Sequence, residues 1–241
     1  MFDEYHDQIR REALDAFPRE AVWLITPGEC RQVRNVADDP EKAFRADKRS
    51  LTAAHKRGLL AVVHSHPDAP ECPSESDMRG QIASGVPWGI VATDGEACGN
   101  PFFWGDGVEP PALIGRPFRH GVTDCYALIR DYYQLEHGVR LPEFPRRWQW
   151  HLHGDDLYTQ GYAQAGFRKL SPDEEPRPGD MFFAQIRSDV PNHGGILLDG
   201  SLILHHVCSR HPYDPARLSK REPIGRWLNL ITSWYRHEAL E

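Results

Sequence analysis

The stretch "AVVHSHPDAPECPSESDMRG" (residues 61–80) decides the fold of the first half of this 241-residue chain. An apolar run leads into His64 and His66, and Ser74 and Asp77 follow a few residues later. Residues two apart in a strand point to the same face, so both imidazoles are expected on one side of a buried strand. The segment after Ser74 has the pattern of a capped helix. The stretch therefore predicts a strand, a loop and a helix that carry four polar side chains.

Two interpretations of these four residues are open. Two imidazoles and the Asp77 carboxylate form a three-ligand set that suits catalytic zinc, with the fourth position left for water. The S-x-x-D pattern is equally that of a capping box, in which Ser74 and Asp77 satisfy free backbone N–H groups. The residues alone leave both alternatives standing. A second H-x-H pair, His151 and His153, has no apolar strand before it and is expected to lie in a loop.

The composition restricts the class of protein. Hydrophobic residues make up 40% and charged residues 26%, which is typical of globular chains, and the length allows one large or two modest domains. A net charge of −7 provides no basic field, so nucleic acid is not an expected partner. No apolar run is long enough for an integral membrane segment, and the acidic N-terminus lacks a signal pattern. The chain is expected to be made in the cytoplasm and to stay there unless something else carries it out.

Patterns along the chain predict two domains. The first contains alternating helical and strand-like segments, expected at residues 3–16, 21–28, 39–55, 58–66, 74–85 and 88–95. Glycine and proline are frequent over residues 105–121, which places a boundary there and gives domains of residues 1–108 and 109–241. The second domain is expected to begin with helix 123–138, followed by a helix at 157–165 and by strands at 179–186, 193–199, 201–207 and 225–237.

Of five widely spaced cysteines, only Cys125 lies at the predicted start of a strong helix. The partial positive charge of a helix N-terminus favours a thiolate, although a buried inert thiol is the usual state of a single cysteine. A thiolate nucleophile also needs a histidine base and a third residue that orients it. His193 and His205 are available on two strands that a turn near Asp199 would join as a hairpin, and His206 is the alternative if the register slips by one residue.

The first domain resembles the JAMM (Mov34-type) metallopeptidases. The resemblance rests on H-S-H-P followed by S-x-x-D, and on "ALDAFPREAVWLI" (residues 13–25), a helix, a proline and a glutamate before a strand. It implies one Zn²⁺ in this domain. The implied roles are zinc ligand for His64, His66 and Asp77, support of the oxyanion for Ser74, and general base for Glu20. The residues after that glutamate depart from the small residues and glycine usual in the family.

The second domain resembles the NlpC-type cell-wall cysteine peptidases. "TDCYALIRDYY", "RPGDMFFAQ" and "NHGGILLDGSLILHH" are similar to the family's nucleophile helix, its P-G-D turn and its two strands that carry polar residues. The resemblance implies that Cys125 is the nucleophile, His193 the base and His205 the orienting residue, and that peptidoglycan stem peptides are cut at a D-glutamyl–diaminopimelate bond. Tyr126 stands where the family has a small residue, and "LIGRPFRHG" lacks a tyrosine often found near the cleft.

A chain that joins these two domains in this order resembles the tail tip assembly proteins of lambda-like phages. The expected fold is α+β, with a JAMM-like mixed sheet and flanking helices before a papain-like antiparallel sheet whose nucleophile helix comes first. The resemblance implies tail tip proteins and stem peptides as partners. It places the chain in the host cytoplasm during assembly, with the virion tail tip and the periplasmic cell wall as a later site of action. A maturation protease and a non-enzymatic assembly factor are the alternatives.

Overall fold

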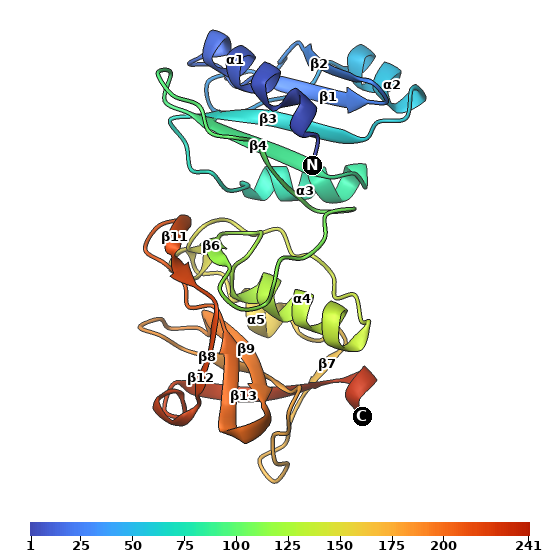
Figure 1. The fold of residues 1–241 in the computed structure, drawn as a ribbon. Helices are drawn as coiled ribbons and strands as arrows, with labels where there is room; N and C mark the ends of the chain where they lie inside the picture. Colours follow the sequence, from blue (N-terminus) through green and yellow to red (C-terminus); the bar gives the residue numbers. More distant parts are fainter. The chain divides into compact units, whose positions relative to one another are not determined.

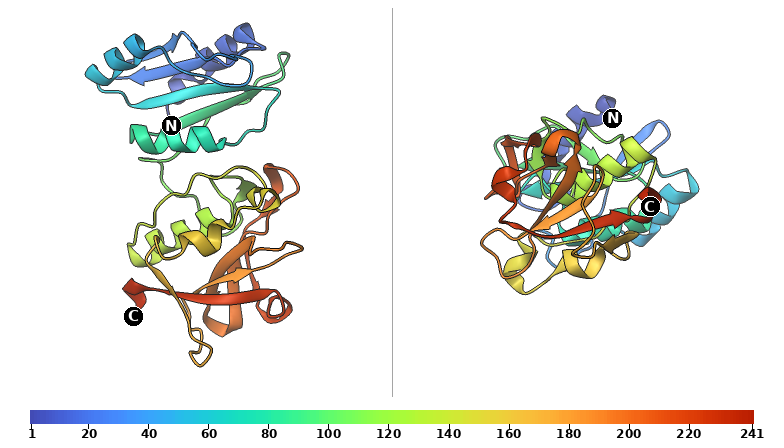
Figure 2. Two further views of the ribbon diagram at one scale, coloured as in Figure 1. Left: turned by 180° about the vertical axis from the view of Figure 1, so that it is seen from behind. Right: turned by 90° about the horizontal axis from the view of Figure 1, so that it is seen from below.

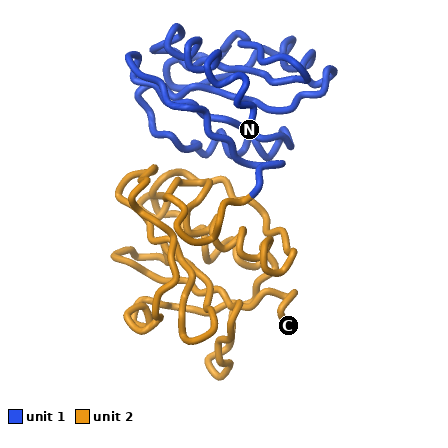
Figure 3. The backbone as a smooth tube through the Cα atoms, viewed as in Figure 1, with its two compact units in different colours: residues 1–109 blue, residues 110–241 orange.

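The structure is a computed structural model that describes residues 1–241, and it divides into two compact units, Met1–Glu109 and Pro110–Glu241 (Figure 3). Unit 1 is built on a five-stranded sheet in the order β2-β1-β3-β4-β5. Figure 1 labels the first four of these strands. Its parallel pair is β3–β4, and its other pairs are antiparallel, so the sheet is mixed. The strands are β1 (Val22–Thr26), β2 (Glu29–Val33), β3 (Ala61–Pro67), β4 (Trp88–Thr93) and β5 (Phe102–Trp104).

The helices of unit 1 begin and end where the sequence supplies caps. They are η1 (Asp3–Tyr5), α1 (His6–Ala16), α2 (Lys48–Lys56) and α3 (Glu75–Ser84). Ser74 caps α3, and Gly85, with a positive φ of 65°, ends it as expected. The helix expected at 39–55 is shorter, because Asp47 accepts a hydrogen bond from the Ser50 N–H at 2.9 Å and so starts α2 there.

One face of the first sheet forms a core with α1. Ile9 and Ala13 of the helix pack against Trp23, Val63 and Val91 of the strands, all of them buried. Side chains alternate between the faces of a strand, so His64, beside Val63, lies on the other face. Packing of the apolar face against α1 thus holds β3 in the sheet. The opposite face carries polar side chains such as His64.

Unit 2 packs one long helix, α4 (Cys125–His137), against an antiparallel sheet (Figure 2). This sheet has six strands in the order β12-β10-β9-β8-β13-β7. Leu128 and Ile129 of α4 are buried against Phe183, Ile196 and Leu204 of the strands. The strands are β7 (Phe167–Lys169), β8 (Met181–Ala184), β9 (His193–Leu198), β10 (Leu202–His205), β12 (Lys220–Pro223) and β13 (Ile231–His237). A separate two-stranded sheet pairs β6 (Pro117–Arg119) with β11 (Tyr213–Leu218).

Several elements of unit 2 differ from the sequence expectation in length. α5 covers only Leu157–Gly161, and the segment 225–237 divides into η4 (Gly225–Trp227) and β13. The expected hairpin is confirmed: β9 and β10 pair in antiparallel fashion around η3 (Asp199–Ser201). The loop that holds His151 and His153 contains a short turn, η2 (Trp150–His153).

Both units combine helices with sheets in separate segments, so the chain has the α+β fold that the sequence predicts, with a mixed sheet followed by an antiparallel one. None of the helices is both long enough and apolar enough to cross a bilayer.

Candidate functional sites

Three side chains meet on the polar face of the first sheet. His64 and His66 come from β3, and Asp77 comes from the first turn of α3. The two Nε2 atoms are 3.0 Å apart, and the Asp77 oxygens lie 3.5 Å from His64 Nε2 and 3.7 Å from His66 Nε2. All three residues are buried. The structure therefore brings together the three residues that the sequence marks as metal ligands.

These separations suit a single metal ion. Ligand atoms at tetrahedral angles and at zinc bond lengths of 2.0–2.2 Å lie roughly 3.4 Å from one another. The three observed separations fall on either side of that value. Imidazole nitrogens and one carboxylate are also the donor types of three-ligand catalytic zinc sites. The residues present thus fit Zn²⁺ both in spacing and in chemistry.

The surrounding residues fix the two rings. His66 Nδ1 lies 2.7 Å from the Pro70 carbonyl oxygen, which makes Nδ1 the donor and leaves Nε2 as a bare acceptor. His64 is fully buried, and Phe44 stacks on its ring at a centroid distance of 4.3 Å. Trp88 meets the same ring edge-on. Aromatic side chains therefore exclude water from one side of the cluster.

Burial and mutual charge shift the ionisation of the cluster. Burial lowers the pKa of His64 below its usual range. Burial has the same tendency at His66, but Asp77, the Pro70 carbonyl and Glu20 outweigh it and raise the pKa of that ring. Burial would raise the pKa of Asp77, whereas the two histidines and Ser74 hold it well below its usual range. The carboxylate is therefore ionised, as a metal ligand must be.

Glu20 belongs to the same face of the sheet. β1 pairs with β3 so that Val22 lies opposite His64, and Ala21 exchanges hydrogen bonds with Ser65 at 2.8 and 2.9 Å. Continuing this register places Glu20 opposite His66, and residues directly opposite in an antiparallel pair share a face. Burial, partly offset by His66, raises the pKa of Glu20 to about 7.

Ser74 and Asp77 do form the capping box that was the alternative interpretation. Ser74 Oγ accepts from the Asp77 N–H at 3.2 Å, and Asp77 Oδ2 accepts from the Ser74 N–H at 2.8 Å and from Ser74 Oγ at 2.7 Å. The other Asp77 oxygen lies toward His64. The Asp77 carboxylate can therefore cap the helix with one oxygen and face a metal with the other. The two interpretations do not exclude each other.

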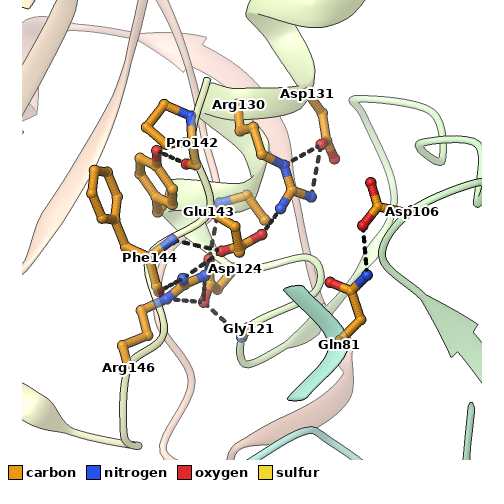
Figure 4. Close-up of polar contacts among 12 residues, drawn as sticks. Gln81, Asp106, Gly121, Asp124, Arg130, Asp131, Pro142, Glu143, Phe144 and Arg146 are labelled. Carbon is orange, nitrogen blue, oxygen red and sulfur yellow. Dashed lines mark hydrogen bonds and ion pairs between the residues drawn. The ribbon is translucent and has the colours of Figure 1, made fainter. Parts of the chain in front are cut away.

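In unit 2, Cys125 is the first residue of α4, and a dense polar cluster holds the start of that helix (Figure 4). Asp124 caps α4 by accepting from the Ala127 N–H at 3.0 Å. The Arg146 guanidinium donates to both Asp124 oxygens, with Nη2 at 2.8 and 2.9 Å and Nε at 3.1 Å. Glu143 binds the same guanidinium at 2.9 Å. The position of Cys125 is thus set by a buried ion pair one residue before it.

The Cys125 sulfur lies 3.0 Å from the Tyr158 hydroxyl oxygen. It also interacts with the backbone of Gly194 through a hydrogen bond. The sequence predicts a favoured thiolate here, but enclosure of the sulfur and the negative charge of Asp124 raise the pKa of the thiol to about 11. Tyr158, Arg146 and Gly194 act in the other direction without reversing the shift. The thiol is therefore protonated near neutral pH, and a base is required to activate it.

His193 and His205 are neighbours on β9 and β10. His193 Nε2 lies 3.0 Å from His205 Nδ1, and His205 Nε2 lies 2.7 Å from Glu222 Oε1 on β12. Trp227 covers both rings, with centroid distances of 5.4 and 4.6 Å. The three polar side chains thus form one line of hydrogen bonds beneath a tryptophan.

No hydrogen bond joins Cys125 to either histidine in this structure. Along β9, His193 shares its face with Trp227, whereas Gly194 faces Ile129 of α4. Cys125 therefore contacts β9 at Gly194, on the face that packs against α4, and the His193 ring lies on the opposite face. His206, the alternative third residue, instead directs Nε2 to the Arg217 carbonyl at 2.9 Å. Of the two histidines, it is His205 that the structure pairs with His193.

Sequence patterns did not point to Glu222, Tyr158 or Arg146, because these residues reach the site from segments far along the chain. Glu222 follows Lys220 and Arg221 in a polar strand, and Tyr158 lies in a short helix. The Tyr158 hydroxyl lies 3.0 Å from the Cys125 sulfur, although "LIGRPFRHG" contains no tyrosine. In the β10–β12 register Glu222 lies opposite Ile203 and Lys220 lies opposite His205, so the contact between Glu222 and His205 is a diagonal one. Diagonal cross-strand neighbours can interact through long side chains, but the pairing of β12 with β10 has to be known first.

Each of the two domains matches the model of a known protein family. Residues 3–104 match the family of prokaryotic homologs of the JAB domain, and residues 99–226 match the NlpC/P60 family, a cysteine peptidase family. The crystal structure of the NlpC/p60 domain of the peptidoglycan hydrolase SagA is 18% identical, covers 52% of this chain and 89% of its own, and superposes with a TM-score of 0.33.

Two phage proteins are similar over most of the chain. Tail tip assembly protein K of Escherichia phage N15 is 31% identical over 91% of this chain and 88% of its own length. Tail tip assembly protein K of Escherichia phage lambda is 36% identical over 78% of this chain and 87% of its own length. This chain belongs to the family of the phage tail tip assembly protein K, with a JAB-like domain followed by an NlpC/P60 domain.

Proposed function

We propose that the NlpC/P60 domain of this tail tip assembly protein is a peptidoglycan endopeptidase that cuts stem peptides at a D-glutamyl–diaminopimelate type bond. The observation that carries the proposal is the His193–His205 pair, 3.0 Å apart, on the paired strands β9 and β10 that the Cys125 helix contacts. In this proposal Cys125 is the nucleophile, His193 the general base and His205 the residue that orients it. In this structure the sulfur faces Tyr158 and the His193 ring lies on the other face of β9, so the proposed reaction requires the start of β9 or of α4 to move until the ring meets the sulfur.

The proposed reaction has two stages. His193 takes the thiol proton, the Cys125 sulfur attacks the scissile carbonyl, and the proton passes to the leaving amine as the C–N bond breaks. Water then attacks the thioester, with His193 again accepting a proton, which releases the acid and restores the thiol. The free N–H groups at the start of α4 lie beside the sulfur, where they can stabilise the oxyanion.

The JAB-like domain is proposed to be a second, zinc-dependent peptidase. His64, His66 and Asp77 would hold Zn²⁺, which when bound polarises the scissile carbonyl and acidifies a water molecule. Glu20, whose pKa of about 7 suits proton transfer near neutral pH, would take and return the proton. The Ser74 hydroxyl would turn from Asp77 to support the oxyanion.

The chain is proposed to act in two places. During assembly in the host cytoplasm its partners would be the other tail tip proteins. At the virion tail tip it would reach stem peptides of the cell wall in the periplasm. The K-type relatives carry tail tip assembly in their names, which supports the first location. The presence of a cysteine peptidase domain supports the second.

The proposal is tested by mass spectrometry of muropeptides incubated with the wild-type protein, with Cys125→Ala and with Cys208→Ala, a second partly buried cysteine. A stem-peptide cut by the wild type and Cys208→Ala alone is the expected result. Absence of any cut by the wild type would contradict the endopeptidase.

The alternative of a maturation protease is tested separately in assembling lysates. If the zinc domain processes a tail protein, Glu20→Gln leaves that protein uncut and Cys125→Ala does not. An unchanged band pattern in Glu20→Gln, together with intact muropeptides, would favour a purely structural assembly factor.

A further inference from the structure

Glu222, His205 and His193 form a chain of hydrogen bonds, and the chemistry of Glu222 decides which atom of each bond is the donor. Glu222 Oε1 is 2.7 Å from His205 Nε2, and His205 Nδ1 is 3.0 Å from His193 Nε2. The last atom of the line, His193 Nδ1, is buried and has no hydrogen-bond partner in the protein. A neutral imidazole has one donor and one acceptor nitrogen, so fixing the proton on the first ring fixes it on the second.

Glu222 is well held for such a role. Trp227 Nε1 donates to the same Oε1 atom at 3.0 Å, and Lys220 and Arg226 bind the Oε2 atom at 3.2 and 2.5 Å. Burial alone would raise the pKa of Glu222, but these cations and His205 lower it to about 2. An ionised carboxylate can only accept hydrogen bonds, so His205 Nε2 must carry the hydrogen.

We propose that Glu222 is a positioning residue that fixes the tautomers of His205 and His193 and leaves His193 Nδ1 as the free base. With the hydrogen on His205 Nε2, His205 Nδ1 accepts from His193 Nε2–H, and the lone pair of His193 lies on Nδ1. The proposal deepens the proposed cysteine peptidase and rests on it for the use of that lone pair. Without Glu222 the opposite chain of donors is equally available and would place a hydrogen on Nδ1.

The charges around the rings agree with two neutral imidazoles. Burial, with further contributions from His205 and His206, lowers the pKa of His193 well below its usual range. Burial, aided by Lys220 and Arg226 and opposed by Glu222, lowers the pKa of His205 to about 4. Each ring thus carries a single hydrogen near neutral pH, which is the condition under which the direction of the line is defined.

The test is ¹⁵N NMR of the imidazole nitrogens in the full-length protein, which distinguishes a protonated ring nitrogen from a bare one without any substrate. Signals are assigned with single His→Gln variants. The expected wild-type spectrum has both His205 and His193 protonated at Nε2. Protonation of His205 at Nδ1 in the wild type would overturn the proposal.

Variants separate positioning from general support of the fold. Glu222→Gln keeps an oxygen that the Trp227 N–H orients, so the wild-type tautomers are expected to persist. Glu222→Leu has no acceptor, so a His193 Nδ1–H signal is expected, with muropeptide turnover reduced about ten- to a hundredfold. Lys220→Ala, which removes a contact to the other carboxylate oxygen, is the matched control.

The outcomes for the positioning role and for the peptidase are distinct. Wild-type tautomers in Glu222→Leu would refute the role of Glu222 whatever the activity. Expected tautomers in every variant without cleavage of muropeptides by the wild type would leave the hydrogen-bond line as described and refute the endopeptidase instead.

Discussion

Arg146 donates three hydrogen bonds to Asp124, and both side chains are almost completely buried at the start of the helix that carries Cys125. Burial opposes ionisation of Asp124, but Arg146 and His120, with the N–H groups of Ala127 and Gly121, hold the pKa of this carboxyl far below its usual range. Cys125 is therefore positioned by a charge pair that is almost completely buried.

Removing one partner of this pair leaves the other charge buried and unpaired. We expect Arg146→Ala to lower the free energy of unfolding of the second domain by about 3–5 kcal/mol, measured by urea denaturation. The neighbouring Arg147 pairs with Asp155 at the surface, so Arg147→Ala should cost at most about 1 kcal/mol. Equal effects of the two substitutions would contradict the importance of burial.

The same pair predicts a pH dependence. The pKa of Asp124 is lowered in the folded protein, so its stabilising contribution is complete above the pKa of the unfolded chain and is lost as the pH falls through the folded value. The difference in stability between the wild type and Arg146→Ala should accordingly shrink in acid. A constant difference from pH 7 to pH 3 would show that Arg146 stabilises by packing alone.

The cluster on the first sheet predicts a metal content. Purified wild-type protein should contain about one zinc per chain by elemental analysis, and His64→Ala should lose it because only two ligands remain. His151→Ala alters the other H-x-H pair, which lies in a short turn, and should keep the metal. A native preparation that is metal-free and cannot be reloaded would refute the zinc site.

Tyr158 predicts how the thiol responds to alkylation. Its hydroxyl stabilises the ionised sulfur, so Tyr158→Phe should raise the thiol pKa further and slow iodoacetamide modification of Cys125 about tenfold at pH 8. In the wild type the rate should keep rising with pH up to the thiol pKa of about 11. Tyr162→Phe is the control, since this residue packs on Tyr235. No difference between the two variants would exclude a role for the hydroxyl.

Gly195 predicts a packing requirement between β9 and β10. A Cβ atom at this position would lie 2.6 Å from the Leu204 carbonyl oxygen, and a backbone atom in a paired strand cannot move aside easily. Gly195→Ala should therefore destabilise the domain and separate His193 from His205, which thermal denaturation and the imidazole NMR signals would detect. Gly225→Ala, where a Cβ meets nothing within 4 Å, should be neutral. Wild-type stability in Gly195→Ala would contradict the tight pairing.

The elements that the sequence predicts best are those with local signals. Ser74 and Gly85 set the bounds of α3, and Asp124 and Gly138 set those of α4, because a side-chain cap and a residue with positive φ act within one turn. The pairing of His64 and His66 follows from strand alternation in the same way. Lengths were less predictable where a competing cap intervened, as Asp47 does at the start of α2.

The parts of the site that could not be predicted depend on long-range packing. Glu222 reaches His205 only because β12 pairs with β10, and Arg146 reaches Asp124 across an irregular segment. The protonated state of Cys125 likewise depends on what encloses the sulfur, which outweighs the helix N-terminus that the sequence reveals.

In both domains a residue proposed for the site lies in the first turn of a helix: Asp77 is part of the capping box of α3, and Cys125 directly follows the cap of α4. A substitution at either cap would therefore change folding and reactivity together. Neither property can drift alone over evolutionary time. A variant meant to remove one of the proposed activities without disturbing a helix should therefore keep both caps and change His64 or Cys125 instead.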